Sequence, residues 1–224
     1  MKILNPEWED YHIHSINFSD WFNTIDEIVQ YAPQIWLTKI AITDHSQMAL
    51  DTSNIAKKNI RSILHKGRWQ NIYNDVEVIF GVEADLLNLE WDICDNIQWK
   101  VPDFIFLSAH KRIYQSSYDT INTAYENAIK KYGNKIKFIG HPCSKDWAEV
   151  LDINRLVKLV NEYNIPLEFD CANLVNQKTD FAILNRMLSK VNEIYVNSDA
   201  HTLYELKICR KEWFKYLKEN KFIN

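Results

Sequence analysis

The stretch Lys39-Ile40-Ala41-Ile42-Thr43-Asp44-His45 indicates the fold class of this chain. Its first five residues are rich in apolar and β-branched side chains, as in a buried β-strand, and two polar residues then follow abruptly. In parallel α/β folds the carboxyl ends of the strands open to solvent, and ligands and chemistry collect there. The stretch therefore predicts a strand of a parallel sheet that ends at a site.

Similar runs recur along the chain, and segments with helical spacing lie between most of them. The predicted strands are residues 11–13, 39–43, 76–82, 104–108, 137–139, 167–169 and 194–197. The predicted helices are residues 25–31, 49–65, 118–132, 153–163, 179–188 and 203–219. This alternation favours a closed or nearly closed parallel α/β barrel of seven strands, with an open doubly wound sheet as the alternative.

The composition is that of an ordinary globular protein. The chain has 224 residues, of which 46% are hydrophobic and 25% are charged, so it is long enough for one large core. It contains no internal repeat, low-complexity segment or linker rich in Pro, Gly and Ser, and we expect a single domain over residues 1–224. The net charge of -4 provides no general basic footprint for long nucleic acid, although it leaves room for a local basic patch.

The cysteines and the N-terminus bear on the cellular compartment. Cys94, Cys143, Cys171 and Cys209 stand far apart without a Cys-x-x-Cys pair, which argues against a zinc knuckle and a disulfide scaffold. Neither a signal peptide nor an apolar run of membrane-spanning length is present. We therefore expect reduced cysteines and a cytoplasmic protein.

Most of the histidines lie at the ends of the predicted strands. Of the seven in the chain, only His65 falls within a predicted helix. The other six lie at the carboxyl end of a strand: His12, His14, His45, His110, His141 and His201. Because these strand ends meet at one edge of a parallel barrel, we expect the six imidazoles to lie close together.

Two of these histidines could bind one metal ion. His12 and His14 are two residues apart on a strand, so their side chains share one face. Taken alone, such a pair is more often solvated or part of a core. Asp20 follows shortly after, and its alternative roles are a turn residue or a helix N-cap.

Carboxylates accompany the other strand ends. Glu83 comes just after an apolar run, where a buried carboxylate is costly unless it is paired or bound to metal, so we take it as a candidate bridging ligand. Asp199 and His201 again lie two residues apart and can flank one site. Asp44 has two alternatives to ligation, because it could orient a neighbouring histidine or cap the next helix.

The motifs resemble those of the PHP (polymerase and histidinol phosphatase) superfamily, in the same order and with similar spacing. They are His12-Ile13-His14, Thr43-Asp44-His45, Gly81-Val82-Glu83, Ser108-Ala109-His110, Gly140-His141-Pro142 and Ser198-Asp199-Ala200-His201. The resemblance extends from Asp10 to His201. It implies a distorted seven-stranded (β/α) barrel, similar to a TIM barrel, that binds two to three divalent metal ions of zinc, manganese or iron.

The resemblance also implies which side chains hold the metals. The implied ligands are His12, His14, Glu83 and Asp199 for a first ion, Glu83, His110 and His141 for a second, and Asp20, His45 and His201 for a third. Asp20 stands where some members have histidine. Two further departures put the substrate in doubt: Glu168-Phe169-Asp170 replaces a Glu-x-Asn motif, and Asn197 replaces a common glycine.

The resemblance further implies a metal-dependent phosphoesterase, in which a hydroxide bridging the metal cluster attacks the phosphorus. The residues implied to be catalytic are Glu83, Asp199, His201 and Arg112. Arg112, Lys145 and Lys178 are candidates for phosphate binding because each follows a strand end, with a solvated surface charge as the alternative for each. A small phosphomonoester similar to histidinol phosphate is the leading substrate. The alternatives are a phosphodiesterase or exonuclease acting on nucleotides or short oligonucleotides, and a metal-stabilised binding module without turnover.

Overall fold

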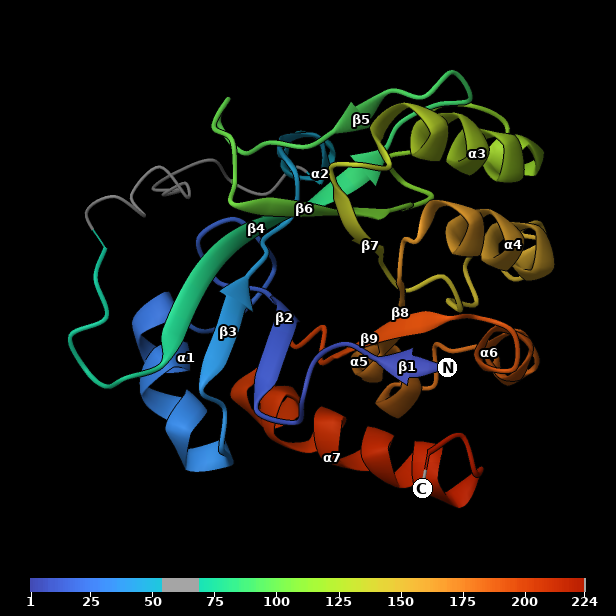
Figure 1. Ribbon diagram of the computed structural model, residues 1–224. Helices are drawn as coiled ribbons and strands as arrows, with labels where there is room; N and C mark the ends of the chain where they lie inside the picture. Colours follow the sequence, from blue (N-terminus) through green and yellow to red (C-terminus); the bar gives the residue numbers. More distant parts are fainter. Residues whose placement is uncertain (54–68, 224) are drawn as a thin grey trace.

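Seven parallel strands form the centre of the molecule (Figure 1). The computed structural model describes residues 1–53 and 69–223. The seven strands pair with one another in chain order: β2 (Glu9–Ile13), β3 (Lys39–Ile42), β4 (Glu77–Leu86), β6 (Phe104–Ser108), β7 (Ile136–Ile139), β8 (Leu167–Asp170) and β9 (Glu193–Asn197). Two short strands flank them, β1 (Lys2–Ile3) parallel to β9 and β5 (Ile93–Cys94) antiparallel to β4.

The sheet curls until its first and last long strands lie side by side (Figure 1). A single parallel bridge joins Ile13 to Ala200, just beyond the end of β9. The side chain of Asn197 accepts a hydrogen bond from the backbone N–H of Tyr11 at 3.0 Å. This seam between β2 and β9 confirms the distorted seven-stranded barrel, and the open doubly wound sheet is wrong.

Helices follow most of the strands. They are α1 (Ile25–Tyr31), α2 (Gln47–Thr52), α3 (Ile121–Tyr132), α4 (Ile153–Tyr163), α5 (Cys171–Val175), α6 (Phe181–Leu188) and α7 (Leu203–Glu219), with the 3-10 turns η1 (Ala32–Ile35) and η3 (Tyr118–Thr120). The predictions for α1, α4 and α7 are confirmed to the residue. The helix predicted at 49–65 begins earlier, because Ser46 caps it by accepting from the Ala49 N–H, and its part beyond residue 53 lies outside the described residues.

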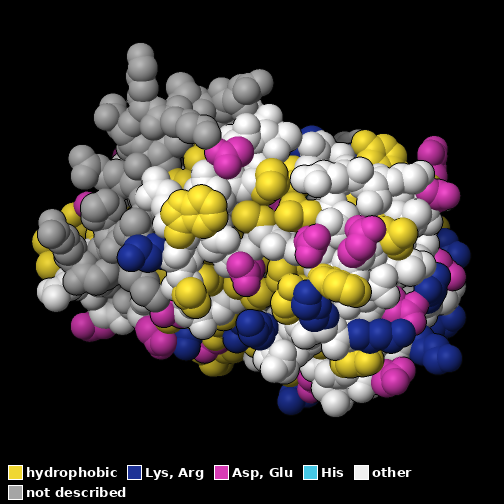
Figure 2. All heavy atoms as spheres, turned by 90° about the horizontal axis from the view of Figure 1, so that it is seen from above, with side chains coloured by type: hydrophobic (Ala, Val, Ile, Leu, Met, Phe, Trp, Pro, Cys, Tyr) yellow, Lys and Arg dark blue, Asp and Glu magenta, His cyan; other side chains and the backbone are white. Residues whose placement is uncertain are grey.

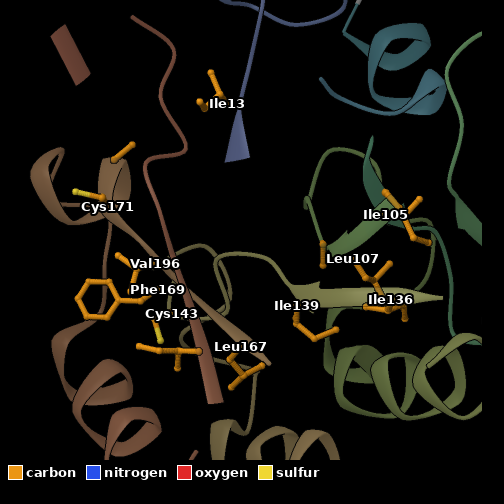
Figure 3. Packing of buried hydrophobic residues seen from close by; sticks show 14 of the residues in the cluster. Ile13, Ile105, Leu107, Ile136, Ile139, Cys143, Leu167, Phe169, Cys171 and Val196 are labelled. Carbon is orange, nitrogen blue, oxygen red and sulfur yellow. The ribbon is translucent and has the colours of Figure 1, made fainter. Parts of the chain in front are cut away.

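Two layers of apolar side chains hold the barrel together. The larger lies between the sheet and the helices, and Figure 3 shows part of it, with Ile105 and Leu107 of β6 beside Ile136 and Ile139 of β7. The smaller fills the barrel interior with the buried residues Tyr11, Ala41, Phe106 and Phe138. The rings of Phe106 and Phe138 stack with centroids 4.5 Å apart, and Phe106 lies 4.4 Å from the ring of His12. This interior cluster therefore packs against the histidine cluster from inside the barrel.

The outer surface is mixed in character. Figure 2 shows hydrophobic, basic and acidic side chains interspersed on the face seen from above in Figure 1. Among the described residues, no helix combines the length and the apolar composition needed to cross a membrane.

Candidate metal centre

The carboxyl ends of the strands bring together the six predicted histidines and three predicted carboxylates. His12 lies within β2, and Glu83 lies within β4. The others follow strands or occupy the loop after β2: His14, Asp20, His45, His110, His141, Asp199 and His201. All of the histidines and Glu83 are buried or half-buried, and Asp20 is the exposed member. Side chains from strands far apart in the sequence therefore share one pocket.

The first group of side chains forms a compact triangle of ligand atoms. The Nε2 atoms of His12 and His14 lie 3.1 Å apart, and each lies 3.1 Å from Oδ1 of Asp199. Bonds of about 2.0–2.1 Å in a tetrahedral zinc site place ligand atoms about 3.3 Å apart. The triangle therefore has the size that one metal ion requires.

Glu83 lies between two groups of histidines. Its Oε2 atom faces Nε2 of His14 at 3.6 Å and Nδ1 of His45 at 2.7 Å. Its Oε1 atom faces Nε2 of His141 at 2.7 Å and Nε2 of His110 at 3.4 Å. The two oxygens of one carboxylate thus point to different ligand sets, which is the arrangement of a bridging ligand.

The third group contains Asp20, His45 and His201. Oδ1 of Asp20 lies 3.6 Å from Nε2 of His45 and 3.3 Å from Nε2 of His201. His45 is shared, because it also clusters with Glu83 and His110 closely enough to hold an ion. This second association of His45 did not follow from the sequence motifs.

The donor set passes a further test of fit for metal ions. Nδ1 of His14 is buried without a hydrogen-bond partner among the described residues, and the 2.7 Å contact between Oε2 of Glu83 and Nδ1 of His45 lacks the geometry of a hydrogen bond. Such atoms are costly to bury unless something else satisfies them. A mixture of imidazole and carboxylate donors suits zinc, manganese or iron. The residues present therefore fit a cluster of divalent metal ions.

The ionisable groups in the pocket strongly shift the pKa values of one another. Burial would lower the pKa of His45 and of His141, but the carboxylate of Glu83 outweighs it and raises them to about 10 and about 9. His14 behaves in the opposite way, because burial and the nearby His201 and His45 lower its pKa to about 3. Burial opposes ionisation of Glu83, yet the surrounding histidines hold its pKa well below the usual value. The carboxylate of Glu83 therefore favours protonation of His45 and His141, and the surrounding imidazoles favour its ionisation.

A family model described as the PHP domain matches residues 10–223. The chain belongs to the PHP-domain family. A Yersinia enterocolitica protein named "Probable phosphatase" is 22% identical to this PHP domain over 205 residues, covering 89% of this chain and 80% of that protein. A Yersinia pestis protein with the same name matches with the same identity and coverage.

Two solved structures resemble the fold of this PHP domain. One is histidinol phosphate phosphatase from Lactococcus lactis, in complex with zinc, L-histidinol and phosphate, with a TM-score of 0.59 and 14% identity over 95% of this chain and 93% of that one. The other is a candidate histidinol phosphatase from Listeria monocytogenes, with a TM-score of 0.57 and 14% identity over 92% of this chain and 99% of that one. At this level of identity the likeness supports the fold alone.

Acceptors behind the cluster orient the histidines of this PHP domain. Nδ1 of His12 donates to Glu168 at 2.9 Å, and Nδ1 of His201 donates to the carbonyl of Asp199 at 3.0 Å. Nδ1 of His110 lies 2.6 Å from Oδ1 of Asp85. In each case the proton is on Nδ1, which leaves the lone pair of Nε2 facing the cluster.

Asp85 is a site residue that the sequence interpretation missed. The predicted strand stopped at residue 82, whereas β4 continues to Leu86. Glu83 and Asp85 are two apart on that strand, so both point to the same side. Had the predicted strand been extended to residue 85, the alternation of side chains between the two faces would have placed Asp85 on the same face as Glu83.

Asp44 plays neither of the two roles considered for it. Its carboxylate accepts from the backbone N–H of Ser15 at 2.5 Å and from the Ser15 hydroxyl at 2.6 Å, and Ser46 is the cap of α2. Burial raises the pKa of Asp44 to about 6. It therefore ties the loop after β2 to the end of β3.

The two glycines before ligand motifs are required by close packing. A Cβ on Gly81 would lie 2.8 Å from Cγ2 of Thr43, and one on Gly140 would lie 2.9 Å from Cε2 of Phe106. The crowding comes from neighbouring strands and not from the ligands themselves. The missing side chains let β4 and β7 approach their neighbours, which sets the positions of Glu83 and His141.

The three candidate phosphate-binding residues differ in their surroundings. Arg112 is exposed and lines a small hollow with Asp20 and His45 at the edge of the third group. Nζ of Lys145 donates to the carbonyl of Gln177 at 2.7 Å, and Lys178 is exposed on the same loop. Of the three, Arg112 is the one that the structure brings beside the cluster.

Proposed function

We propose that this PHP domain hydrolyses a small phosphomonoester with the help of divalent metal ions. The observation that carries the proposal is the triangle of His12, His14 and Asp199, with ligand atoms 3.1 Å apart, beside the carboxylate of Glu83. Structural burial alone does not explain so many ionisable groups in one pocket, since each is costly to desolvate.

Nine side chains would hold the ions. His12, His14, Glu83 and Asp199 form the first site, Glu83, His110 and His141 the second, and Asp20, His45 and His201 the third. Zinc is the first candidate because the Lactococcus lactis neighbour contains it, and manganese and iron suit the same donors. Asp20 adds a carboxylate oxygen to the two imidazoles of the third site.

Bound divalent ions would lower the pKa of a water molecule and neutralise the charge of phosphoryl oxygens. The side chains of this chain would supply the rest. Glu168 and Asp85 hold His12 and His110 in the orientation that binding requires. The guanidinium of Arg112 would contact phosphate oxygens, for which its planar pair of N–H groups is suited.

The names of the relatives and of the structural neighbour support a substrate class. The Yersinia relatives carry the name of a phosphatase, and the Lactococcus lactis neighbour was solved with L-histidinol and phosphate. These support a small phosphorylated substrate, of which histidinol phosphate is one candidate. The free state of Cys94, Cys143, Cys171 and Cys209 is consistent with a cytoplasmic location, which we also propose.

The decisive experiment combines metal analysis with a substrate panel. The purified chain should contain zinc, manganese or iron by elemental analysis. After reconstitution with each metal it should hydrolyse p-nitrophenyl phosphate and histidinol phosphate faster than bis-p-nitrophenyl phosphate. Faster hydrolysis of the diester would point to a phosphodiesterase, and no hydrolysis despite bound metal would point to a binding module.

Replacing Glu83 or Asp199 with alanine should abolish this activity and reduce the bound metal. Glu162 of α4 is an exposed carboxylate far in sequence from every proposed ligand, so Glu162→Ala serves as the control and should change neither quantity. Full activity in Glu83→Ala would contradict the proposal.

A further inference from the structure

A second concave site lies at the end of the barrel opposite the metal centre. This groove has a volume of about 980 Å³ and lies between α7 and the segments that lead into β2 and β3. Its lining includes Trp8, which precedes β2, and residues 34–38, which precede β3. These are the amino ends of the strands, whereas the metal ligands lie at the carboxyl ends. The groove is therefore separate from the centre described above.

Lysines line one wall of the groove. Lys207, Lys211, Lys215 and Lys218 of α7 are all exposed, and none forms an ion pair with another residue in the described part of the chain. At about 1.5 Å per residue they extend over about 16 Å of the helix. The groove also contains two carboxylates, Glu7 and Glu219, so positive charge predominates.

Exposed aromatic rings also line the groove. Trp36 is 85% exposed and Trp8 is 54% exposed, and the half-buried Ile35 and Phe214 add apolar surface. Trp36 has a φ of 66°, a left-handed conformation that favours glycine or asparagine. Neither the backbone conformation nor burial of the side chain therefore explains a tryptophan at this position, and its indole is accessible to a partner.

We propose that this groove binds a single-stranded oligonucleotide, with bases stacked on Trp36 and Trp8 and phosphates along the lysines of α7. A positively charged groove that also carries exposed aromatic rings is typical of sites that bind single strands without sequence preference. At the spacing of about 3.4 Å per phosphate along one strand of B-form DNA, the row of lysines would span about five nucleotides, and a more extended strand would place fewer along it. The metal centre plays no part in this contact.

Other occupants fit the groove less well. The cores of protein interfaces are depleted in lysine, whereas lysines form a whole wall here. A small ligand would be largely enclosed, which does not agree with a tryptophan that is 85% exposed. A bilayer surface is flat, so it would not fill a concave groove. A second copy of this chain would place one row of lysines against another.

The proposal can be tested by fluorescence anisotropy of fluorescein-labelled oligo(dT) and oligo(dA) of about ten nucleotides. Both should bind the full chain at low salt with similar affinity, because stacking is tolerant of sequence. With four phosphate contacts at about 0.7 each, the logarithm of the association constant should fall with the logarithm of salt with a slope of about -3. Binding should persist in EDTA and in Glu83→Ala, so a failure of the proposed hydrolase function would leave this result unchanged.

Two pairs of matched variants locate the binding. Trp36→Ala should weaken binding by at least about fivefold. Trp99→Ala should have no effect, because Trp99 has nearly the same exposure of 86% and the same φ of 66° but does not line the groove. Lys211→Gln with Lys215→Gln should reduce the salt slope to about half, whereas Lys135→Gln with Lys158→Gln should leave it unchanged.

Several outcomes would overturn the proposal. One is no binding of either oligonucleotide at about 50 mM salt, where charge contacts are strong. Another is an equal loss of oligonucleotide affinity in Trp36→Ala and Trp99→Ala, which would mean that any binding occurs outside the groove. Sedimentation with phosphatidylcholine and phosphatidylglycerol vesicles, abolished by Trp36→Ala and without oligonucleotide binding, would assign the groove to a membrane surface instead.

Discussion

At the scale of single residues, Asp85 illustrates how a buried carboxylate supports the proposed metal centre. It is fully buried and contacts His110 Nδ1 at 2.6 Å and the Ser46 hydroxyl at 2.5 Å. Asp85→Asn keeps the shape but removes the charge, so we expect a loss of about 10- to 100-fold in metal affinity or activity. Metal titration and phosphatase assays would measure it. Asp146→Asn, at an exposed carboxylate, is the control, and equal behaviour of the two variants would contradict this role.

Arg112 can be tested at the same scale. Loss of a charge-assisted contact to phosphate should raise KM and reduce kcat/KM by about 10- to 100-fold in Arg112→Ala. Arg112→Lys should recover only part of the loss, because an ammonium cannot make the paired contact. Lys145→Ala should have a smaller effect, since Nζ of Lys145 already donates to the Gln177 carbonyl. A larger effect of Lys145→Ala would reverse this assignment.

At the scale of elements, the side chain of Asn197 contributes to the seam between β2 and β9. Asn197 accepts from the Tyr11 N–H at 3.0 Å and donates to Glu168 at 2.8 Å, so it also steadies the carboxylate behind His12. Asn197→Ala leaves these buried groups without partners and should reduce the free energy of unfolding by about 1–3 kcal/mol. Denaturant unfolding would measure this loss. Asn192→Ala, at an exposed position, should cost much less, and equal losses would refute the role of the seam.

At the scale of the whole molecule, metal binding should be coupled to pH. The carboxylate of Glu83 overcomes the effect of burial and holds the pKa of His45 at about 10 and that of His141 at about 9, so both are protonated at neutral pH without metal. A metal ion binds only neutral imidazole and must displace these protons. Metal affinity should therefore rise as pH increases from about 6 to about 8.

Thermal shift assays at several pH values, with and without manganese or zinc, would measure this coupling. The metal-induced rise in Tm should be larger at high pH, because fewer protons must then be displaced. Without metal, the stability of the folded chain should instead fall as pH rises. A histidine whose pKa is raised by folding stabilises the folded state fully at pH values below its unfolded-state pKa. This stabilisation is lost as pH rises through its folded-state pKa. A metal-induced shift independent of pH would contradict the coupling.

Much of the fold and of the site could be predicted from local sequence. The strand at 39–43 and the helices at 153–163 and 203–219 are recognisable because their apolar spacing is a property of neighbouring residues. The family motifs contain eight of the nine proposed ligands, and the resemblance to the family implied Asp20 as the ninth. The short elements β1, β5 and α5 were missed, because so few residues do not produce a recognisable period.

The sequence by itself determined the seven long strands and the histidines at their ends, because both depend on residues that are close together along the chain. The tertiary structure alone decided that Glu168 orients His12, 156 residues away, that Asp85 orients His110, and that Trp36 lines one groove with the lysines of α7. These partners meet only because the sheet curls until its edges meet and α7 packs beneath it. The curvature of a sheet results from the packing of the whole chain, so no local pattern specifies it.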